Sequence, residues 1–157
     1  IYSSVSAALL IARYIRWNAE IFGNDEPNID ETLQFAKKFV PNIDDYEDDV
    51  NFYTNCKTVK ELQLSEYGKI GYSLKALGSA IWALRYCLSI EEGIEKIIRE
   101  GGDADTNGAV VGAILGAKFG FKKIPSDLIE FMFVKQWMFR EIIPFLKLMG
   151  IEMTQLQ

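Results

Sequence analysis

The chain contains 157 residues, a length that suits one compact domain with a sizeable buried core. Its 17 lysine and arginine residues are outnumbered by 22 aspartate and glutamate residues, which gives a formal net charge of −5, and 49% of the residues are apolar. This composition is typical of a soluble globular protein. It disfavours intrinsic disorder and disfavours nucleic acid as the main partner.

The chain has no histidine, which excludes several catalytic systems. A Ser-His-Asp or Cys-His nucleophile, an HExxH zinc helix and any histidine-ligated metal are all ruled out. General acid–base catalysis would have to use carboxylates, lysine, tyrosine or cysteine. The two cysteines, Cys56 and Cys87, form no CxxC pair, which is typical of a reducing compartment and predicts a cytoplasmic location.

No membrane anchor is expected. The longest apolar stretch, residues 108–121, is interrupted by Lys118 and is shorter than the ~20 residues of a spanning helix.

The first half of the chain contains two clear helical patterns. Apolar residues at steps of three and four predict an amphipathic helix over residues 1–22. A second helix is predicted from Asp30 to about Val40, where Pro41 ends it. The expected core stripe of the first helix is Val5, Leu9, Ala12, Ile15 and Ala19.

Between Pro41 and Gly71 the periodic signal is weak. The acidic residues of this stretch are expected to form an unstructured, solvated run, with no role in metal binding. Thr58 and Glu61 have the spacing of a capping box. The acidic residues in question are Asp44, Asp45, Glu47, Asp48 and Asp49.

The second half of the sequence predicts further helices. Ser73 is expected to cap a helix over 74–88, and the capping box of Ser89 and Glu92 opens another that the glycines at 101 and 102 end. A further helix is predicted over about 105–119, and one or two more are predicted before Gly150. No segment alternates polar and apolar residues, so the sequence predicts a single all-α domain of six to eight helices over 1–157. Its aromatic residues are expected mostly in the core, among them Trp17, Trp82, Phe131, Phe133 and Trp137.

The segment Gly101-Gly102-Asp103-Ala104-Asp105-Thr106-Asn107-Gly108 lies between two predicted helices. Inside a helix, side chains two residues apart differ in direction by about 200°, whereas in an extended turn they point the same way. The glycine pair tolerates positive φ and close approach by another segment or a ligand. Two convergent carboxylates and the hydroxyl of Thr106 then form an all-oxygen cluster suited to Mg²⁺ or Mn²⁺.

A purely structural role for these aspartates stays open, because one can be an N-cap and the other a first-turn acid favoured by the helix dipole. Two sharper alternatives fit poorly. An EF-hand loop starting at Asp103 would need a bidentate glutamate at its twelfth position, where Ile114 stands. The nucleophile loop of Asp-based phosphatases follows a buried strand, and here a helix precedes the motif.

Glycines recur at every fourth position of the next helix: Gly108, Gly112, Gly116 and Gly120. Each interior glycine costs roughly 0.5–1 kcal/mol relative to alanine. This ridge therefore predicts a central helix against which another backbone packs closely.

The acidic segment and the glycine ridge together resemble the C-terminal signature of the ADP-ribosylglycohydrolase family of the dinitrogenase-reductase-activating-glycohydrolase type. The segment from Lys69 through the helix at 74–84 and the stretch from Ser89 to Arg99 are also similar to that family. The resemblance covers about residues 62–128 closely and the first helix more loosely.

This resemblance implies an all-α fold that holds two divalent cations, usually magnesium, which bind ADP-ribose and position water for hydrolysis of its bond to a protein side chain or small group. By position, Asp103, Asp105 and Thr106 would be metal ligands. Gly101 and Gly102 would shape the turn at the cofactor, and Asn107 would orient a ligand from outside the metal shell. Two ions also suit a chain without histidine, because they lower the pKa of bound water.

The family's other metal ligands, a Thr-Asp-Asp cluster, and its catalytic acid have no counterpart here, so no catalytic residue is assigned. The chain is expected to be the C-terminal part of such a domain, with little or no activity alone. A non-catalytic ADP-ribose-binding or structural relative is the alternative. Expected partners are ADP-ribose or an ADP-ribosylated protein, with association through exposed apolar surface as a third possibility.

Overall fold

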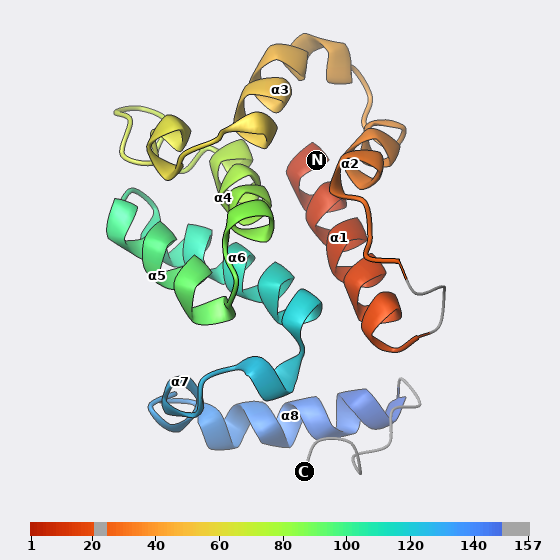
Figure 1. The fold of residues 1–157 in the computed structure, drawn as a ribbon, viewed down its shortest axis with the longest axis vertical. Helices are drawn as coiled ribbons and strands as arrows, with labels where there is room; N and C mark the ends of the chain where they lie inside the picture. The colour runs from red at the N-terminus through yellow and green to blue at the C-terminus, as the bar shows by residue number, and fades with distance from the viewer. Residues whose placement is uncertain (21–24, 149–157) are drawn as a thin grey trace.

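The computed structural model describes residues 1–20 and 25–148, which form eight α-helices and three short 3₁₀ helices with no strand among them (Figure 1). The predicted all-α fold is thus confirmed. The α-helices are α1 (Tyr2–Asn18), α2 (Ile29–Lys37), α3 (Glu47–Asn55), α4 (Ser73–Tyr86), α5 (Ile90–Glu100), α6 (Ala104–Phe119), α7 (Ser126–Glu130) and α8 (Lys135–Leu148). The 3₁₀ helices are η1 (Ile43–Tyr46), η2 (Val59–Leu62) and η3 (Phe121–Lys123).

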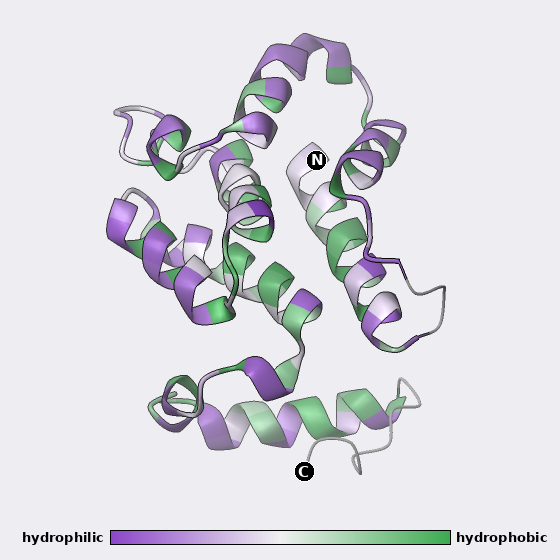
Figure 2. Cartoon of the chain, in the orientation of Figure 1, coloured by the Kyte–Doolittle hydropathy of each residue, from purple (hydrophilic) through white to green (hydrophobic). Residues whose placement is uncertain are grey.

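Helices α4 and α6 form the centre of the fold. Every residue of α4 from Leu74 to Leu84 is buried, and α6 packs against α1, α4 and α5. In Figure 2 both central helices carry green apolar stretches, whereas α5 is mostly purple. Helix α5 buries one face only, through Ile90, Gly93 and Ile97, which explains its strongly amphipathic sequence.

The buried face of α1 differs from the predicted stripe. Ala12 and Ala19 are exposed and Ile15 is 52% exposed. The buried positions follow one another at four-residue steps and are shifted by one residue from the predicted stripe. The hydroxyl of Ser6 has no hydrogen-bond partner among the described residues, whereas both buried tyrosines have one: Tyr2 donates to the carbonyl of Leu33 and Tyr14 donates to Glu26 Oε1. Hydrogen bonding makes burial of the two tyrosine hydroxyls acceptable, which an apolar pattern cannot reveal. The buried positions are Tyr2, Ser6, Leu10 and Tyr14.

The predicted helix over 1–22 ends at Asn18, and its last two residues lie outside the described residues.

The acidic run at 44–49 is helical, so its interpretation as unstructured was wrong. Residues 43–46 form η1, and three acidic residues fill the first turn of α3. Acidic side chains at a helix N-terminus are favoured by the helix dipole. Glu47 also forms an ion pair with Lys37 of α2 at 2.9 Å.

Of the predicted caps, the one at Ser89 is found, whereas neither Thr58 nor Ser73 makes a side-chain cap. Ser89 accepts from the backbone N–H of Glu92 at 3.1 Å and thereby starts α5 as predicted. Glu61 accepts from the backbone N–H of Lys57 and from the Thr58 hydroxyl at the start of η2. Ser73, however, is the first residue of α4 and not its cap.

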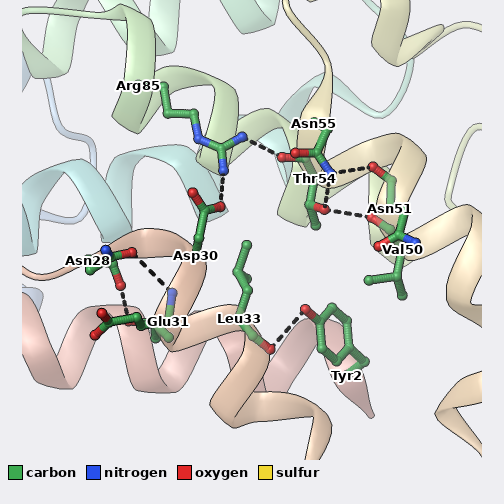
Figure 3. A network of polar contacts seen from close by, with 11 residues as sticks. Tyr2, Asn28, Asp30, Glu31, Leu33, Val50, Asn51, Thr54, Asn55 and Arg85 are labelled. Atoms are coloured by element: carbon green, nitrogen blue, oxygen red, sulfur yellow. Dashed lines mark hydrogen bonds and ion pairs between the residues drawn. The ribbon is translucent and has the colours of Figure 1, made fainter.

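A polar network joins three helices around the core. Arg85 of α4 donates to the carboxylate of Asp30 on α2 and to the carbonyl oxygen of Thr54 on α3, both at 2.5 Å (Figure 3). One guanidinium can bridge two partners because its donors are arranged as a rigid fork. The contact fixes α2 and α3 relative to α4.

The glycine ridge of α6 meets side chains rather than another backbone. A Cβ at Gly108 would lie 3.3 Å from Ile98, and one at Gly112 would lie 3.4 Å from Ile94, both on α5. Gly116 and Gly120 have no atom within 4 Å of the Cβ position. The closest helix-to-backbone approach occurs at Gly78 of α4 instead, where a Cβ would lie 2.7 Å from the carbonyl oxygen of Tyr53.

The aromatic residues near the C-terminal end are not core, contrary to the sequence-based expectation. Trp82 is buried, and Trp17 is half-buried. Phe131, Phe133 and Trp137 are 86%, 102% and 56% exposed.

Within residues 1–20 and 25–148, no helix has the length and apolar character needed to cross a membrane.

Two helix-interior glycines give a matched test of this packing. Gly78→Ala is expected to lower the free energy of unfolding by about 1–3 kcal/mol, because the added methyl meets the Tyr53 backbone. Gly116→Ala, where the space is open, is expected to raise it by about 0.5–1 kcal/mol through helix propensity. Urea unfolding followed by circular dichroism measures both, and equal effects would contradict the close approach at Gly78.

Candidate functional site

The turn between α5 and α6 is built by two glycines with positive φ. Gly101 has φ +85° and Gly102 has φ +71°, a region that residues with a Cβ rarely adopt. A Cβ on Gly102 would also lie 2.2 Å from the carbonyl oxygen of Leu64. Both expected reasons for the glycine pair, backbone conformation and close approach, therefore apply at Gly102.

The turn brings the two aspartates together. Asp103 occupies the N-cap position of α6 with non-helical φ and ψ of −81° and 66°, and Asp105 lies in the first helical turn. The predicted extended turn is therefore not found at Asp105, which is already helical. The pKa of Asp105 is lowered, first by a hydrogen bond with the Asp103 carboxyl group and then by the backbone N–H of Thr106, 2.9 Å from Oδ1.

The capping role does not account for Asp103. Its side chain makes no capping hydrogen bond to α6, although it stands at the N-cap position. Its Oδ2 atom instead lies 3.9 Å from the place that a Cβ would take at Gly71, just before α4. The carboxylate is therefore turned toward the start of α4.

A cavity of about 220 Å³ opens at this place, between the N-terminal ends of α1, α4 and α6. It contains three of the predicted site residues, while Gly101, Gly102 and Asp105 lie outside its lining. Its lining includes Ser3, Tyr72, Ser73, Asp103, Thr106 and Asn107.

Asn107 carries an unpartnered polar group in this cavity. Its side chain is 2% exposed, and its Nδ2 atom has no hydrogen-bond partner within the part of the chain that the structure describes. A buried donor without a partner costs about 1–3 kcal/mol. The amide is therefore placed to donate to an oxygen atom of a molecule in the cavity.

The opposite wall comes from residues that sequence analysis did not assign to the site. Tyr72 donates to Asp49 Oδ2 at 2.8 Å, and the pKa of Tyr72 is raised to about 12 by burial and by this carboxylate. Ser3 of α1 donates to Ser73 of α4 at 3.2 Å. These contacts join positions 23 and 70 residues apart, so helical periodicity could not find them. The Gly71-Tyr72 pair, which forms part of the family resemblance, was the available signal.

The donor set fits part of a site for a hard cation. Asp103 and Asp105 offer carboxylate oxygens and Thr106 offers a hydroxyl, the oxygen ligands that Mg²⁺ and Mn²⁺ prefer. The unpartnered amide of Asn107, in the cavity that Asp103 and Thr106 also line, supports a ligand here. Among the residues of known placement, no three His, Cys, Asp or Glu side chains cluster as a complete metal site.

Comparison with known proteins assigns the chain to a family. The sequence model of the ADP-ribosylglycohydrolase family matches residues 1–148. The chain belongs to the ADP-ribosylglycohydrolase family. No curated protein and no solved structure gives a significant match.

The family assignment gives the cavity a chemical context. ADP-ribosylglycohydrolases are hydrolases of the glycosidase class, are generally metal-dependent and act on ADP-ribosylated substrates. The matched region of the chain includes all three helix ends that line the cavity.

Gly102 and Gly68 give a matched test of the turn, because both have positive φ but only Gly102 is crowded. Gly68→Ala, with no atom within 4 Å of the new Cβ, is expected to lower the free energy of unfolding by about 1–2 kcal/mol. Gly102→Ala should cost about 1–3 kcal/mol more, since the methyl overlaps the Leu64 carbonyl. Urea titration measures the difference, and equal losses would show that the turn does not rest on Leu64.

Proposed function

We propose that this chain takes part in Mg²⁺-dependent hydrolysis of the glycosidic bond between ADP-ribose and a protein side chain or small group. One observation carries the proposal: Asp103, Thr106 and the unpartnered amide of Asn107 line one cavity. Family membership supplies the reaction class.

Asp103, Asp105 and Thr106 would hold the metal. When bound, a pair of such ions polarises the substrate and lowers the pKa of water, with Mn²⁺ as a possible substitute for Mg²⁺. The Thr-Asp-Asp cluster that the family resemblance implies as the other metal ligands has no counterpart in this sequence. The proposal therefore assigns to this chain part of a dinuclear site and, on its own, little or no turnover.

The remaining residues would bind and orient the substrate. The N-terminus of α6 presents the positive end of the helix dipole, which favours a phosphate group. Asn107 would donate to a substrate oxygen. Apolar side chains on the walls, among them Leu77 and Val110, limit the space for water. Tyr72 is neutral at physiological pH, because its pKa is raised to about 12. It therefore lines the cavity and does not act as a base.

Titration calorimetry with Mg²⁺ tests the metal ligands. Asp105→Ala and Asp103→Asn should each weaken Mg²⁺ binding by at least the 10–100-fold that changes around a metal typically cost, because each removes a carboxylate oxygen. Asp127→Ala is the control, since Asp127 is also an exposed first-turn acid but of α7, away from the cavity. Metal binding unchanged by both site variants would reject the assignment.

Asn107 is expected to act on ADP-ribose and not on the metal. Asn107→Leu keeps the side-chain size and removes one hydrogen bond, so ADP-ribose affinity at saturating Mg²⁺ should fall about 5-fold while Mg²⁺ affinity stays the same. Asn51→Leu on the exposed surface of α3 serves as control. A parallel fall in Mg²⁺ affinity would show that Asn107 supports the metal instead.

Release of free ADP-ribose from a modified protein, assayed with the full-length protein as well as with this chain, separates the proposed hydrolase from a non-catalytic relative. Binding of ADP-ribose that persists in Asp103→Asn and Asp105→Ala, with no release at any Mg²⁺ concentration, would favour the non-catalytic alternative.

A further inference from the structure

Lys75 is a cation buried completely inside the fold. Its side chain is 0% exposed, on the first turn of α4. Its ammonium group donates to the carbonyl oxygen of Gln63 at 2.5 Å and to Glu66 Oε2 at 3.1 Å. The pKa of Glu66 is lowered, first because of this hydrogen bond. Burying an ammonium ion is costly unless its partners are well placed, so the contact strongly favours one geometry of the segment around it.

The segment that Lys75 holds has no regular secondary structure of its own. Gln63 has φ +50°, an uncommon conformation for a residue with a side chain. From there the backbone proceeds by successive turns, with the N–H of Glu66 donating to Gln63 and that of Lys69 donating to Glu66. The ammonium group of Lys75 thus connects both ends of residues 63–66 to the central helix α4.

The same four residues form the surface on which the acidic turn rests. A Cβ on Gly102 would overlap the carbonyl oxygen of Leu64. The hydroxyl of Ser65 lies 3.2 Å from the corresponding position at Gly101 and donates to the carbonyl of Glu100 at 3.5 Å. A shift of residues 63–66 would therefore move the turn that carries Asp103 and Asp105.

We infer that Lys75 is a positioning residue for the acidic turn: by holding residues 63–66 against Gly101 and Gly102, its ammonium group sets the separation of the Asp103 and Asp105 carboxylates for a divalent cation. The inference rests on the proposed function, since it gives these carboxylates a metal to hold. Groups outside the metal shell commonly fix the orientation of the ligands, and their removal costs about 10–100-fold in metal affinity. A residue that merely stabilises the core would not change affinity in the folded protein.

Binding of Mn²⁺ alone, followed by electron paramagnetic resonance, tests this role in the full chain. Lys75→Met removes the ammonium group and keeps the length of the side chain, and a loss of about 10-fold in Mn²⁺ affinity is expected. Lys69→Met is the matched control, because Lys69 also pairs with Glu66, at 3.5 Å, but is 54% exposed. Val50→Ala, a core change on α3, controls for lost stability. Both controls should bind Mn²⁺ as the wild type does.

Hydrogen exchange gives a readout independent of metal. Lys75→Met should speed exchange at the amides of residues 63–66 and 101–103 more than in the rest of the molecule. If Lys75→Met does not fold, Glu66→Gln, at a partly exposed site, takes its place, with weaker Mn²⁺ binding and faster local exchange expected.

The outcomes separate the two proposals. A wild type that binds no Mn²⁺ overturns the metal assignment itself, and unchanged exchange at 101–103 in Lys75→Met then also overturns the link from Lys75 to the turn. A wild type that binds Mn²⁺ together with a Lys75→Met variant of equal affinity overturns the role of Lys75 alone.

Discussion

The contact between the carbonyl of Leu64 and Gly102 is the constraint on which the candidate site depends. It requires a residue without a side chain at a positive φ, and it fixes where the chain turns from α5 into α6. Once that turn is set, Asp103 falls just outside α6 and Asp105 just inside it.

The cavity is a product of the way the central helices meet. Helix α6 packs against α1 and α4, and the N-terminal ends of all three lie around the same space (Figure 1). Their first turns contribute small and polar side chains, whereas the following turns contribute the apolar core.

Features that depend on neighbours in the sequence could be predicted. The capping box at Ser89, the glycines that end α5 and the extent of α6 were each identified from residues within a few positions of one another. Features that depend on distant partners could not. The stripe on α1 was placed in the wrong register because Tyr2 and Ser6 are polar, and their burial depends on α2 and its surroundings. The acidic run at 44–49 was not recognised as helical because its charges hide the pattern.

The sequence by itself determined the all-α class, the family and the glycine turn with its two aspartates, because each is written in local spacing and composition. Only the tertiary structure decided which residues share the cavity. It placed Ser3, Tyr72 and Ser73 opposite Asp103, left the amide of Asn107 buried without a partner among the described residues, and set the buried ammonium of Lys75 behind the turn. The physical reason is that these positions lie up to about a hundred residues apart, and only packing of α1, α4 and α6 brings them together.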